Sequence, residues 1–419
     1  MATLRISPLA VLRHCDFRLL WISQLISIAG SQMRIVAVNW HVYALAKADG
    51  RMDPALALGL IGLARVFALV FSAPLSGPMA DRVDRKRTLI VTSLVALLTS
   101  LVLGLATTFG AVNIWLIYTM VIGASVASAF EMPARQALLP RLVPAEILPR
   151  ALSINIIAWQ LATIVGPAIA GILLARIGVA PLYLLDAASF VAVVVAALMM
   201  GQYDVPSVAK RGPVLRDALD GLRFVFGSPM ILSTMLLDFF ATFFGAATTL
   251  MPIFADQILG VGPQGLGLLY AAPAVGAVIA AAVCSSITFR RQGPVLLWAV
   301  AIFGVCTAIF GVSRSLPLTL LALAGGGAAD TVSMVVRGTI RQLLTPDALR
   351  GRMVAVNMVF FAGGPQLGEF ESGVLGSLIG VPYAVLIGGL ACIGFVGYTA
   401  WRHPELRAYD GPDAPAQML

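Results

Sequence analysis

The sequence predicts an all-α membrane protein with twelve transmembrane helices, arranged as two six-helix bundles that repeat in parallel. Of its 419 residues, 59% are hydrophobic and only 11% are charged, which leaves too little polar surface to cover a soluble globule. Twelve separate apolar stretches are each long enough to cross a hydrocarbon core, which takes roughly 20 residues of helix. The second half of the chain also repeats positions of the first half at one fixed offset.

The predicted spans follow one another along the whole chain, and each can satisfy its own backbone hydrogen bonds as a helix. Their ranges are 18–44, 56–79, 89–109, 113–135, 151–175, 181–201, 230–256, 264–288, 294–312, 316–336, 353–377 and 381–401. The polar stretch after the sixth span predicts a cytoplasmic linker with a short amphipathic helix. The chain therefore divides into a first bundle at 1–201, a linker at 202–229, a second bundle at 230–401 and a cytoplasmic tail at 402–419.

Lysine and arginine residues gather in the loops on one side of the predicted spans. With the N-terminus inside, 22 of the 28 fall in cytoplasmic segments and 4 in outer loops, while Arg34 and Arg65 fall within spans. This bias follows the positive-inside rule and predicts that both termini are cytoplasmic. The net charge of +8 is thus a topology signal, and no nucleic-acid partner is expected.

The internal repeat is seen when the sequence is compared with itself at an offset of 202 residues. Arg135, Leu142, Pro144, Arg150, Asn155, Gly166 and Gly171 then coincide with Arg337, Leu344, Pro346, Arg352, Asn357, Gly368 and Gly373. The fourth and fifth spans and their loop are therefore copied in the tenth and eleventh. Parallel repeats of this kind are one known plan of secondary transporters, with a substrate site near mid-membrane at the interface of the halves.

The loop between the second and third spans carries a basic cluster with a glycine and an aspartate. The loop resembles the loop 2–3 signature of the major facilitator superfamily. The matching positions are occupied by Gly77, Asp81, Arg82, Arg85 and Lys86. This resemblance implies the major facilitator fold and a gating role for the loop. The alternative is that these residues only anchor the loop on the cytoplasmic side.

The fifth span partly matches the antiporter motif of the same superfamily, at Gly166, Pro167 and Gly171. This resemblance implies exchange of the cargo for another solute.

Four further stretches resemble the enterobactin-exporter group within the superfamily, and the resemblance spans essentially the whole chain. They are Phe17 to Trp21, Met132 to Arg135, Gln366 to Gly373 and Pro404 to Arg407. The resemblance implies proton-coupled export of a small molecule, such as a catecholate siderophore, across the bacterial cytoplasmic (inner) membrane.

Two charged pairs at the cytoplasmic ends of the fourth and tenth spans are candidate latches. Glu131 and Arg135 are one helical turn apart, so that the carboxylate can pair with its i+4 neighbour or with the loop arginines. In the repeat, Asp330 and Arg337 provide a comparable pair with the carboxylate moved by one turn. By resemblance, these pairs break when the cytoplasmic side opens.

Polar side chains form a stripe on each of two equivalent spans, the first and the seventh. The stripes comprise Gln24, Ser27, Ser31, Arg34 and His41 on one span, and Thr234, Asp238, Thr242 and Thr249 on the other. Both spans resemble the cavity-lining helices of the superfamily, so we expect Arg34 and Asp238 to face one aqueous cavity together with Gln24, Thr242 and Arg65. The alternative is a structural salt bridge between Arg34 and Asp238.

Carboxyl groups inside the spans are candidate proton carriers, because charges there are costly and tend to face protein or water. Burial favours the neutral form of such a group and a neighbouring arginine favours the charged form, which suits a group that must load and unload a proton. Asp238 and Glu369 are the main candidates. Glu371 is a further one, but it points about 200° away from Glu369 on a helix and so has a separate role.

Other classes of function find little support in the sequence. None of the three lysines follows a glycine, so no P-loop is present. The three histidines are scattered and no nucleophile or metal-ligand motif occurs, so no enzyme activity, cofactor or metal is expected. A broad drug exporter and a non-transporting receptor with the same fold remain alternatives. The expected partners are a small-molecule substrate, protons and membrane lipid, with one chain working as a monomer.

Overall fold

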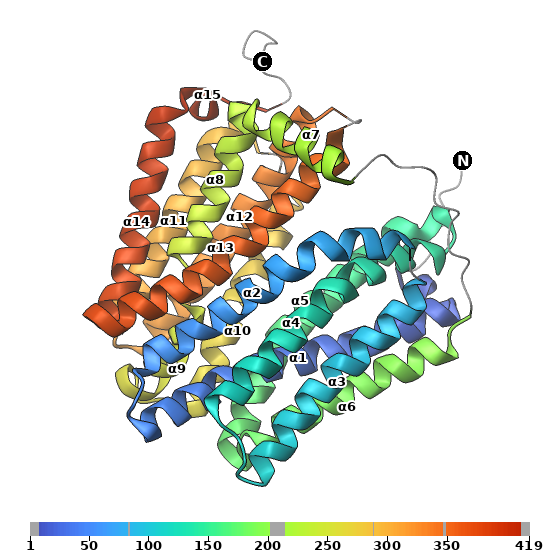
Figure 1. The fold of residues 1–419 in the computed structure, drawn as a ribbon. Helices are drawn as coiled ribbons and strands as arrows, with labels where there is room; N and C mark the ends of the chain where they lie inside the picture. The colour runs from blue at the N-terminus through green and yellow to red at the C-terminus, as the bar shows by residue number, and fades with distance from the viewer. Residues whose placement is uncertain (1–7, 83, 202–213, 288, 347–348, 412–419) are drawn as a thin grey trace. The chain divides into compact units, whose positions relative to one another are not determined.

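The computed structural model describes residues 8–82, 84–201, 214–287, 289–346 and 349–411 (Figure 1). Within them, the side chains of residues 8–10, 73–82, 145 and 214–218 are outside the description. The described ranges contain helices and no strand, which confirms the predicted all-α fold.

Six long helices make up the first half of the chain. They are α1 Cys15–Asp49, α2 Pro54–Arg82, α3 Arg85–Thr108, α4 Ile114–Leu138, α5 Leu148–Ile177 and α6 Ala180–Met199. Short turns of 3₁₀-helix lie at η1 Pro8–Arg13, η2 Leu139–Arg141 and η3 Ala145–Ile147. The predicted linker helix is α7 Val214–Phe226.

The second half contains six further membrane-length segments, one of which is interrupted. Their elements are α8 Pro229–Phe244, η4 Thr248–Leu250, α9 Met251–Ile253, η5 Phe254–Ile258, α10 Gly262–Cys284, α11 Gln292–Val312, α12 Leu316–Leu344, α13 Arg350–Ile379 and α14 Val381–Arg402, followed by α15 Pro404–Arg407. In the described part of the chain, 11 helices are long and apolar enough to cross a membrane. The 30-residue α13 is not among them, because Asn357, Gln366, Glu369 and Glu371 make it more polar.

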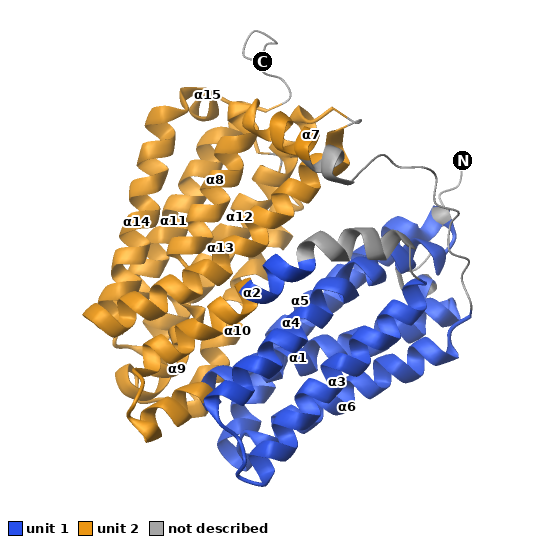
Figure 2. Cartoon of the chain, viewed as in Figure 1, with its two compact units in different colours: residues 1–41, 67–209 blue, residues 42–66, 210–419 orange. Residues whose placement is uncertain are grey.

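The chain forms two compact units, coloured separately in Figure 2. The first comprises residues 1–41 and 67–209, and the second comprises residues 42–66 and 210–419. The last turns of α1 and the first half of α2 therefore pack with the second unit. In the first unit α3 packs against α4 and α6; in the second, α11 packs against α12 and α14, and α13 against α7, α8 and α14. The bundle boundaries expected from the sequence stay a prediction.

The helix ends follow local rules of capping. The Asp84 side chain accepts hydrogen bonds from the backbone N–H groups of Lys86 and Arg87 and so caps α3. Gly178 and Gly380 end α5 and α13 with φ angles of 79° and 91°, a region that L side chains rarely adopt. The internal repeat thus extends to the chain geometry, since α5 and α13 begin and end at equivalent positions.

The predicted span 230–256 is not one continuous helix, which corrects the sequence analysis. The α8 helix ends at Phe244 with Gly245 as its C-cap, and the chain continues through a 3₁₀ turn and the π-helical turn η5. A Cβ atom on Gly245 would lie 2.6 Å from Cζ of Phe303, so any other residue there would have to displace this ring. Hydropathy alone could not show this break, because Pro229–Ile258 as a whole is apolar enough to cross a membrane.

Candidate functional site

The polar stripe predicted on α1 lines a cavity of about 580 Å³ inside the first unit. Gln24, Ser27, Ser31 and Arg34 all lie on its wall, and the predicted substrate contact of Gln24 and Arg34 stays a prediction. The remaining polar lining comes from Gln32, Ser128, Glu131, Arg135, Gln136 and Asn155. Trp159 and Phe190 add aromatic surface. The cavity therefore combines many neutral hydrogen-bonding groups with three charged side chains, Arg34, Glu131 and Arg135, and with aromatic rings.

Arg34 is paired with an acidic residue that the sequence analysis did not name. Its Nε lies 2.8 Å from Oδ2 of Asp186 on α6, a carboxylate that is fully buried. Ser100 donates a hydrogen bond of 2.6 Å to the same oxygen. Asp238 likewise has arginine partners within the second unit, so neither residue depends on the other for a counter-charge. A charge inside an apolar span tends to face protein or water, so Asp186 could have been found by a search for such residues.

The predicted Glu131–Arg135 pair is present on α4, where it forms part of the cavity wall. Both side chains are largely buried, with 12% and 13% of their surfaces exposed. Arg135 Nη2 also donates a hydrogen bond of 3.2 Å to Ser27 Oγ. The pair thus ties α4 to α1 at the cavity, and its role as a latch stays a prediction.

The basic residues after α2 hold helix ends together within the first unit. Lys86 Nζ donates a hydrogen bond of 2.5 Å to the carbonyl oxygen of Met200, and Arg85 Nη1 donates one of 3.0 Å to that of Ala137. These carbonyl groups lie at the C-terminal ends of α6 and α4, where the helix dipole favours cations.

The other gating candidates of this loop, Gly77, Asp81 and Arg82, have side chains outside the described part of the structure. The gating role of the loop as a whole stays a prediction.

The residues of the partial antiporter motif lie in the packed middle of α5. Gly166, Pro167 and Gly171 are all buried. A Cβ atom on Gly166 would lie 2.8 Å from Cβ of Gln32 and 2.9 Å from the carbonyl oxygen of Ala29. This glycine therefore lets α5 pack closely on α1 beside the cavity.

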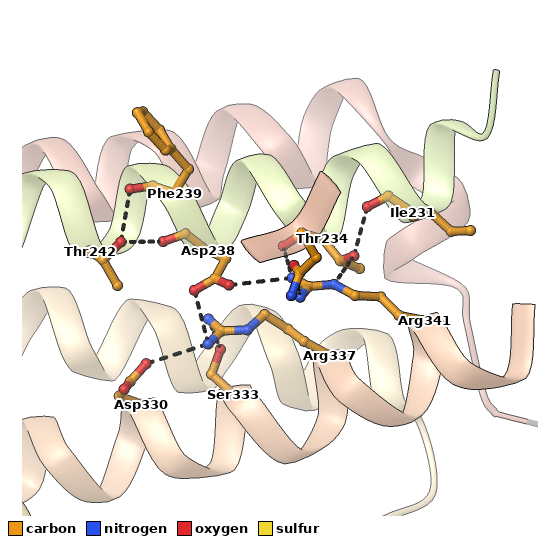
Figure 3. A network of polar contacts seen from close by, with 10 residues as sticks. Ile231, Thr234, Asp238, Phe239, Thr242, Asp330, Ser333, Arg337 and Arg341 are labelled. Atoms are coloured by element: carbon orange, nitrogen blue, oxygen red, sulfur yellow. Dashed lines mark hydrogen bonds and ion pairs between the residues drawn. The ribbon is translucent and has the colours of Figure 1, made fainter. Parts of the chain in front are cut away.

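The second unit contains a buried charge network around Asp238, which is drawn in Figure 3. Its Oδ1 lies 3.0 Å from Arg337 Nη2, and its Oδ2 lies 3.5 Å from Arg341 Nη2. Arg337 also donates a hydrogen bond of 3.0 Å to Ser333 Oγ. Asp238 and Arg337 are each 2% exposed, and Arg341 is 6% exposed. One carboxylate is thus clamped by two guanidinium groups from successive turns of α12.

Arg341 is the centre of further hydrogen bonds in this network. Its Nε and Nη2 donate to Oγ1 and the carbonyl oxygen of Thr234, at 3.1 and 3.0 Å. Its Nη1 donates to Oδ1 of Asn357 on α13. Arg341 was expected in a cytoplasmic loop, because the apolar run of this span ends at residue 336, whereas α12 continues to Leu344.

Two other predicted residues lie at the edge of the network. Asp330 approaches Arg337 at 3.6 Å and its side chain is 45% exposed, so the predicted second latch contact exists but is looser than the Asp238 pair. Thr242 turns back to its own helix and donates to the carbonyl oxygens of Asp238 and Phe239 at 2.9 and 3.1 Å (Figure 3). A cavity role for Thr242 stays a prediction.

Arg65 and Glu369 form an ion pair between α2 and α13, in which one guanidinium nitrogen contacts both carboxylate oxygens. Arg65 Nη1 lies 3.0 Å from Oε1 and 2.9 Å from Oε2 of Glu369. Their side chains are only 19% and 11% exposed. Glu371 is half-buried, and Ser372 donates to it at 3.4 Å. No cation pairs with Glu371 among the described residues, so the two glutamates have different surroundings, as their helical positions predict.

Glycines allow the close approach of α2 and α13 beside this pair. A Cβ atom on Gly62 would lie 2.6 Å from the carbonyl oxygen of Gln366 and 2.7 Å from Cβ of Glu369. We expect Gly62→Ala to force the helices apart and to destabilise the protein by about 1 to 3 kcal/mol. Unfolding in mixed micelles of increasing SDS fraction measures this.

Gly338→Ala is the matched control, because nothing lies within 4 Å of its Cβ position. It should leave stability unchanged or raise it by up to about 1 kcal/mol. Equal effects of the two variants would show that the α2–α13 contact is not tight at Gly62.

The sequence profile of a family described as transmembrane secretion effectors matches residues 6–416 of the chain. The enterobactin exporter EntS of Escherichia coli O157:H7 (strain EC4115 / EHEC) is 27% identical over 411 residues, covering 95% of this chain and 96% of that protein. EntS of Escherichia coli O81 (strain ED1a) is 28% identical over 368 residues, covering 87% and 86%.

Solved structures of transporters share the fold. A bacterial homologue of the human lysosomal transporter Spinster, in an inward-facing and unoccupied conformation, has a TM-score of 0.72 at 13% identity, covering 94% of this chain and 96% of that one. The nucleoside transporter NupG has a TM-score of 0.70 at 13% identity, covering 94% and 100%.

Proposed function

Because the chain belongs to the transmembrane secretion effector family within the major facilitator superfamily of transporters, we propose that it exports a small molecule such as a siderophore in exchange for protons. It is a multi-pass protein of the bacterial inner membrane. The observation that carries the export proposal is the similarity to enterobactin exporters over 95% of the chain.

The cavity of the first unit supports a small cargo with polar groups and rings. Its volume of about 580 Å³ falls in the usual range for small-molecule sites, roughly 300–1,000 Å³. Arg34 is balanced by Asp186, and Arg135 by Glu131. A neutral or weakly charged cargo therefore leaves no buried charge uncompensated, whereas the serine, glutamine and asparagine side chains can bind hydroxyl groups.

Proton coupling is assigned to Glu369 first and to Asp238 second. Glu369 faces one guanidinium group, so its protonation would release a single arginine, Arg65. Protonation of Asp238 would leave two buried arginines to be compensated. Exchange of one proton for one neutral solute at 100 mV releases about 2.3 kcal/mol and supports a cargo gradient of roughly 50-fold.

The proposed cycle is alternating access, in which the two halves of the chain rearrange around a central site. The Glu131–Arg135 and Asp330–Arg337 pairs are proposed to be latches that break as the cytoplasmic side opens. The lysine and arginine bias of the loops supports a cytoplasmic position for both termini. One chain contains both halves, so we propose that a monomer within the lipid bilayer suffices, without nucleic acid or a cofactor.

A transport assay with purified protein tests the proposal. Proteoliposomes containing the protein should move a catecholate siderophore against an imposed proton gradient, and protein-free liposomes should not. A dye and drug panel run in parallel separates the alternatives. Movement of unrelated dyes but no siderophore would indicate a broad drug efflux pump, and no movement of any solute would indicate a non-transporting receptor.

A further inference from the structure

The internal repeat places different side chains at one equivalent position of the two units. At the offset of 202 residues, Arg135 corresponds to Arg337 and Asn155 to Asn357, while Leu139 corresponds to Arg341. The helices that carry these residues match as well, since α4 and α12 begin at equivalent residues, as do α5 and α13. The two units can therefore be compared position by position around this point.

In the second unit, Arg341 fills the space between α8, α12 and α13. Its guanidinium group donates to Oδ1 of Asn357 and to Thr234, and reaches Asp238. A donor supplied by the chain itself thus satisfies the Asn357 acceptor.

In the first unit, the residue at this position is Leu139, which cannot donate a hydrogen bond. Oδ1 of Asn155 is buried and accepts no hydrogen bond from any described residue. Leu139 and Asn155 both line the 580 Å³ cavity. The neighbouring contacts are otherwise parallel, because Arg135 donates to Ser27 on α1 as Arg337 pairs with Asp238 on α8. The cavity thus lies where the second unit holds the Arg341 side chain.

An unpaired buried acceptor is rare in folded proteins and costs free energy unless a partner meets it. Since Arg135 and Arg34 each already have a carboxylate partner, the charges around the cavity are balanced without a further cation. The partner that the site requires is therefore a neutral donor, such as a hydroxyl or an amide N–H. In the second unit the donor is the charged guanidinium of Arg341, which also pairs with the carboxylate of Asp238.

We propose that Asn155 is a specificity-determining residue, whose Oδ1 accepts a hydrogen bond from a neutral donor group of the cargo at the position that Arg341 fills in the repeat. The inference rests on the proposed function in one respect, that the cavity of the first unit receives the cargo. It adds the chemical group that the cargo presents at this point of the wall.

Binding of catechol and of its dimethyl ether, veratrole, to the purified full-length protein tests the subsite. The two probes share a ring and two oxygen atoms, but only catechol can donate. Quenching of tryptophan fluorescence reports binding, because Trp159 lines the cavity, and Trp159→Phe identifies the signal. Wild-type protein should prefer catechol by about tenfold, the usual effect of one hydrogen bond to a buried acceptor.

Substitutions at Asn155 and Leu139 test separately whether catechol binding depends on the Oδ1 acceptor and on the free space beside it. Asn155→Leu keeps the side-chain size but lacks the acceptor, so it should lose the preference for catechol, whereas Asn155→Asp should retain it. Leu139→Arg reproduces the arrangement of the second unit, so its guanidinium should occupy the subsite and weaken catechol binding by at least about tenfold. Thermal unfolding of each variant shows that it is folded.

The outcomes also distinguish the subsite from transport. If wild-type protein does not prefer catechol, or if Asn155→Leu keeps that preference, the subsite is refuted even when a siderophore is exported in proteoliposomes. If the preference depends on Asn155 but no siderophore is exported, the subsite stands and the exporter proposal fails.

Discussion

Glu369→Gln is expected to abolish the cargo gradient that the proton gradient supports, while the protein stays folded. Glutamine keeps the size and the hydrogen-bonding ability of the side chain towards Arg65, but it cannot take up or release a proton. Because one proton at 100 mV can support a gradient of roughly 50-fold, the ratio of cargo across the membrane should fall from that order towards one. Proteoliposomes with an imposed potential and a pH difference measure this ratio directly.

Glu371→Gln is the matched control, because it makes the same chemical change two residues along α13. Glu371 is half-buried and has no cation beside it among the described residues, so its neutralisation should leave the cargo gradient within about twofold of wild type. Counterflow of labelled cargo without a proton gradient should persist in Glu369→Gln, since binding and exchange do not require the proton. A full gradient in Glu369→Gln would assign the Arg65–Glu369 pair a structural role in holding α2 to α13.

The same assay decides between the two candidate carboxyl groups. If Glu369→Gln builds a normal gradient and a folded Asp238→Asn protein does not, Asp238 is the proton carrier. If both variants lose the gradient, stability measurements are needed to show whether Asp238→Asn acts through folding.

The features that could be predicted from the sequence are those set by local patterns. Helix length and composition follow from the apolar runs, and the repeat follows from identities at a fixed offset. The polar stripe from Gln24 to Arg34 could be recognised as a cavity wall, because residues three and four apart share one face of a helix. The i, i+4 spacing likewise predicted the Glu131–Arg135 pair, which requires no knowledge of tertiary contacts.

Partners from distant parts of the chain could not be predicted in this way. The partner of Arg34 is 152 residues away in the sequence, and that of Arg65 is 304 residues away. Several charges of each sign lie within the helices, so the sequence allows many pairings and the packing of the helices selects one. Arg341 shows a second limit of prediction from sequence. The α12 helix continues past the end of its apolar run, so Arg341 is buried although its position in the sequence suggests an exposed loop.

The two units fill equivalent positions of the repeat with different side chains. Where the second unit has Arg337 and Arg341, the first has Arg135 and Leu139. Arg337 pairs with the carboxylate of Asp238, whereas Arg135 donates a hydrogen bond to the hydroxyl group of Ser27. The second unit uses the position for a closed charge network, which orders the helices around it. The first unit leaves a cavity there, as a binding site requires.

Asp238→Asn is expected to destabilise the protein by about 3 to 5 kcal/mol, which is the usual effect of removing one partner from a buried ion pair. The substitution leaves Arg337 and Arg341, which are 2% and 6% exposed, with one carboxylate fewer between them. Those guanidinium groups are almost entirely shielded from solvent, so water cannot replace the lost carboxylate without a rearrangement. Equilibrium unfolding in mixed micelles of increasing SDS fraction measures the loss, and a cargo-free sample excludes effects of binding.

Asp330→Asn provides the comparison for that loss, because Asp330 also contacts Arg337 but at 3.6 Å and with 45% of its side chain exposed. Its effect should stay below about 1 kcal/mol, as is typical of exposed pairs. Adding Arg341→Met to Asp238→Asn should restore part of the stability, since one uncompensated cation is then replaced by an apolar side chain of similar length. If Asp238→Asn and Asp330→Asn have equal effects, or if Arg341→Met makes the double variant less stable than Asp238→Asn alone, the charges of this network do not hold the second unit together.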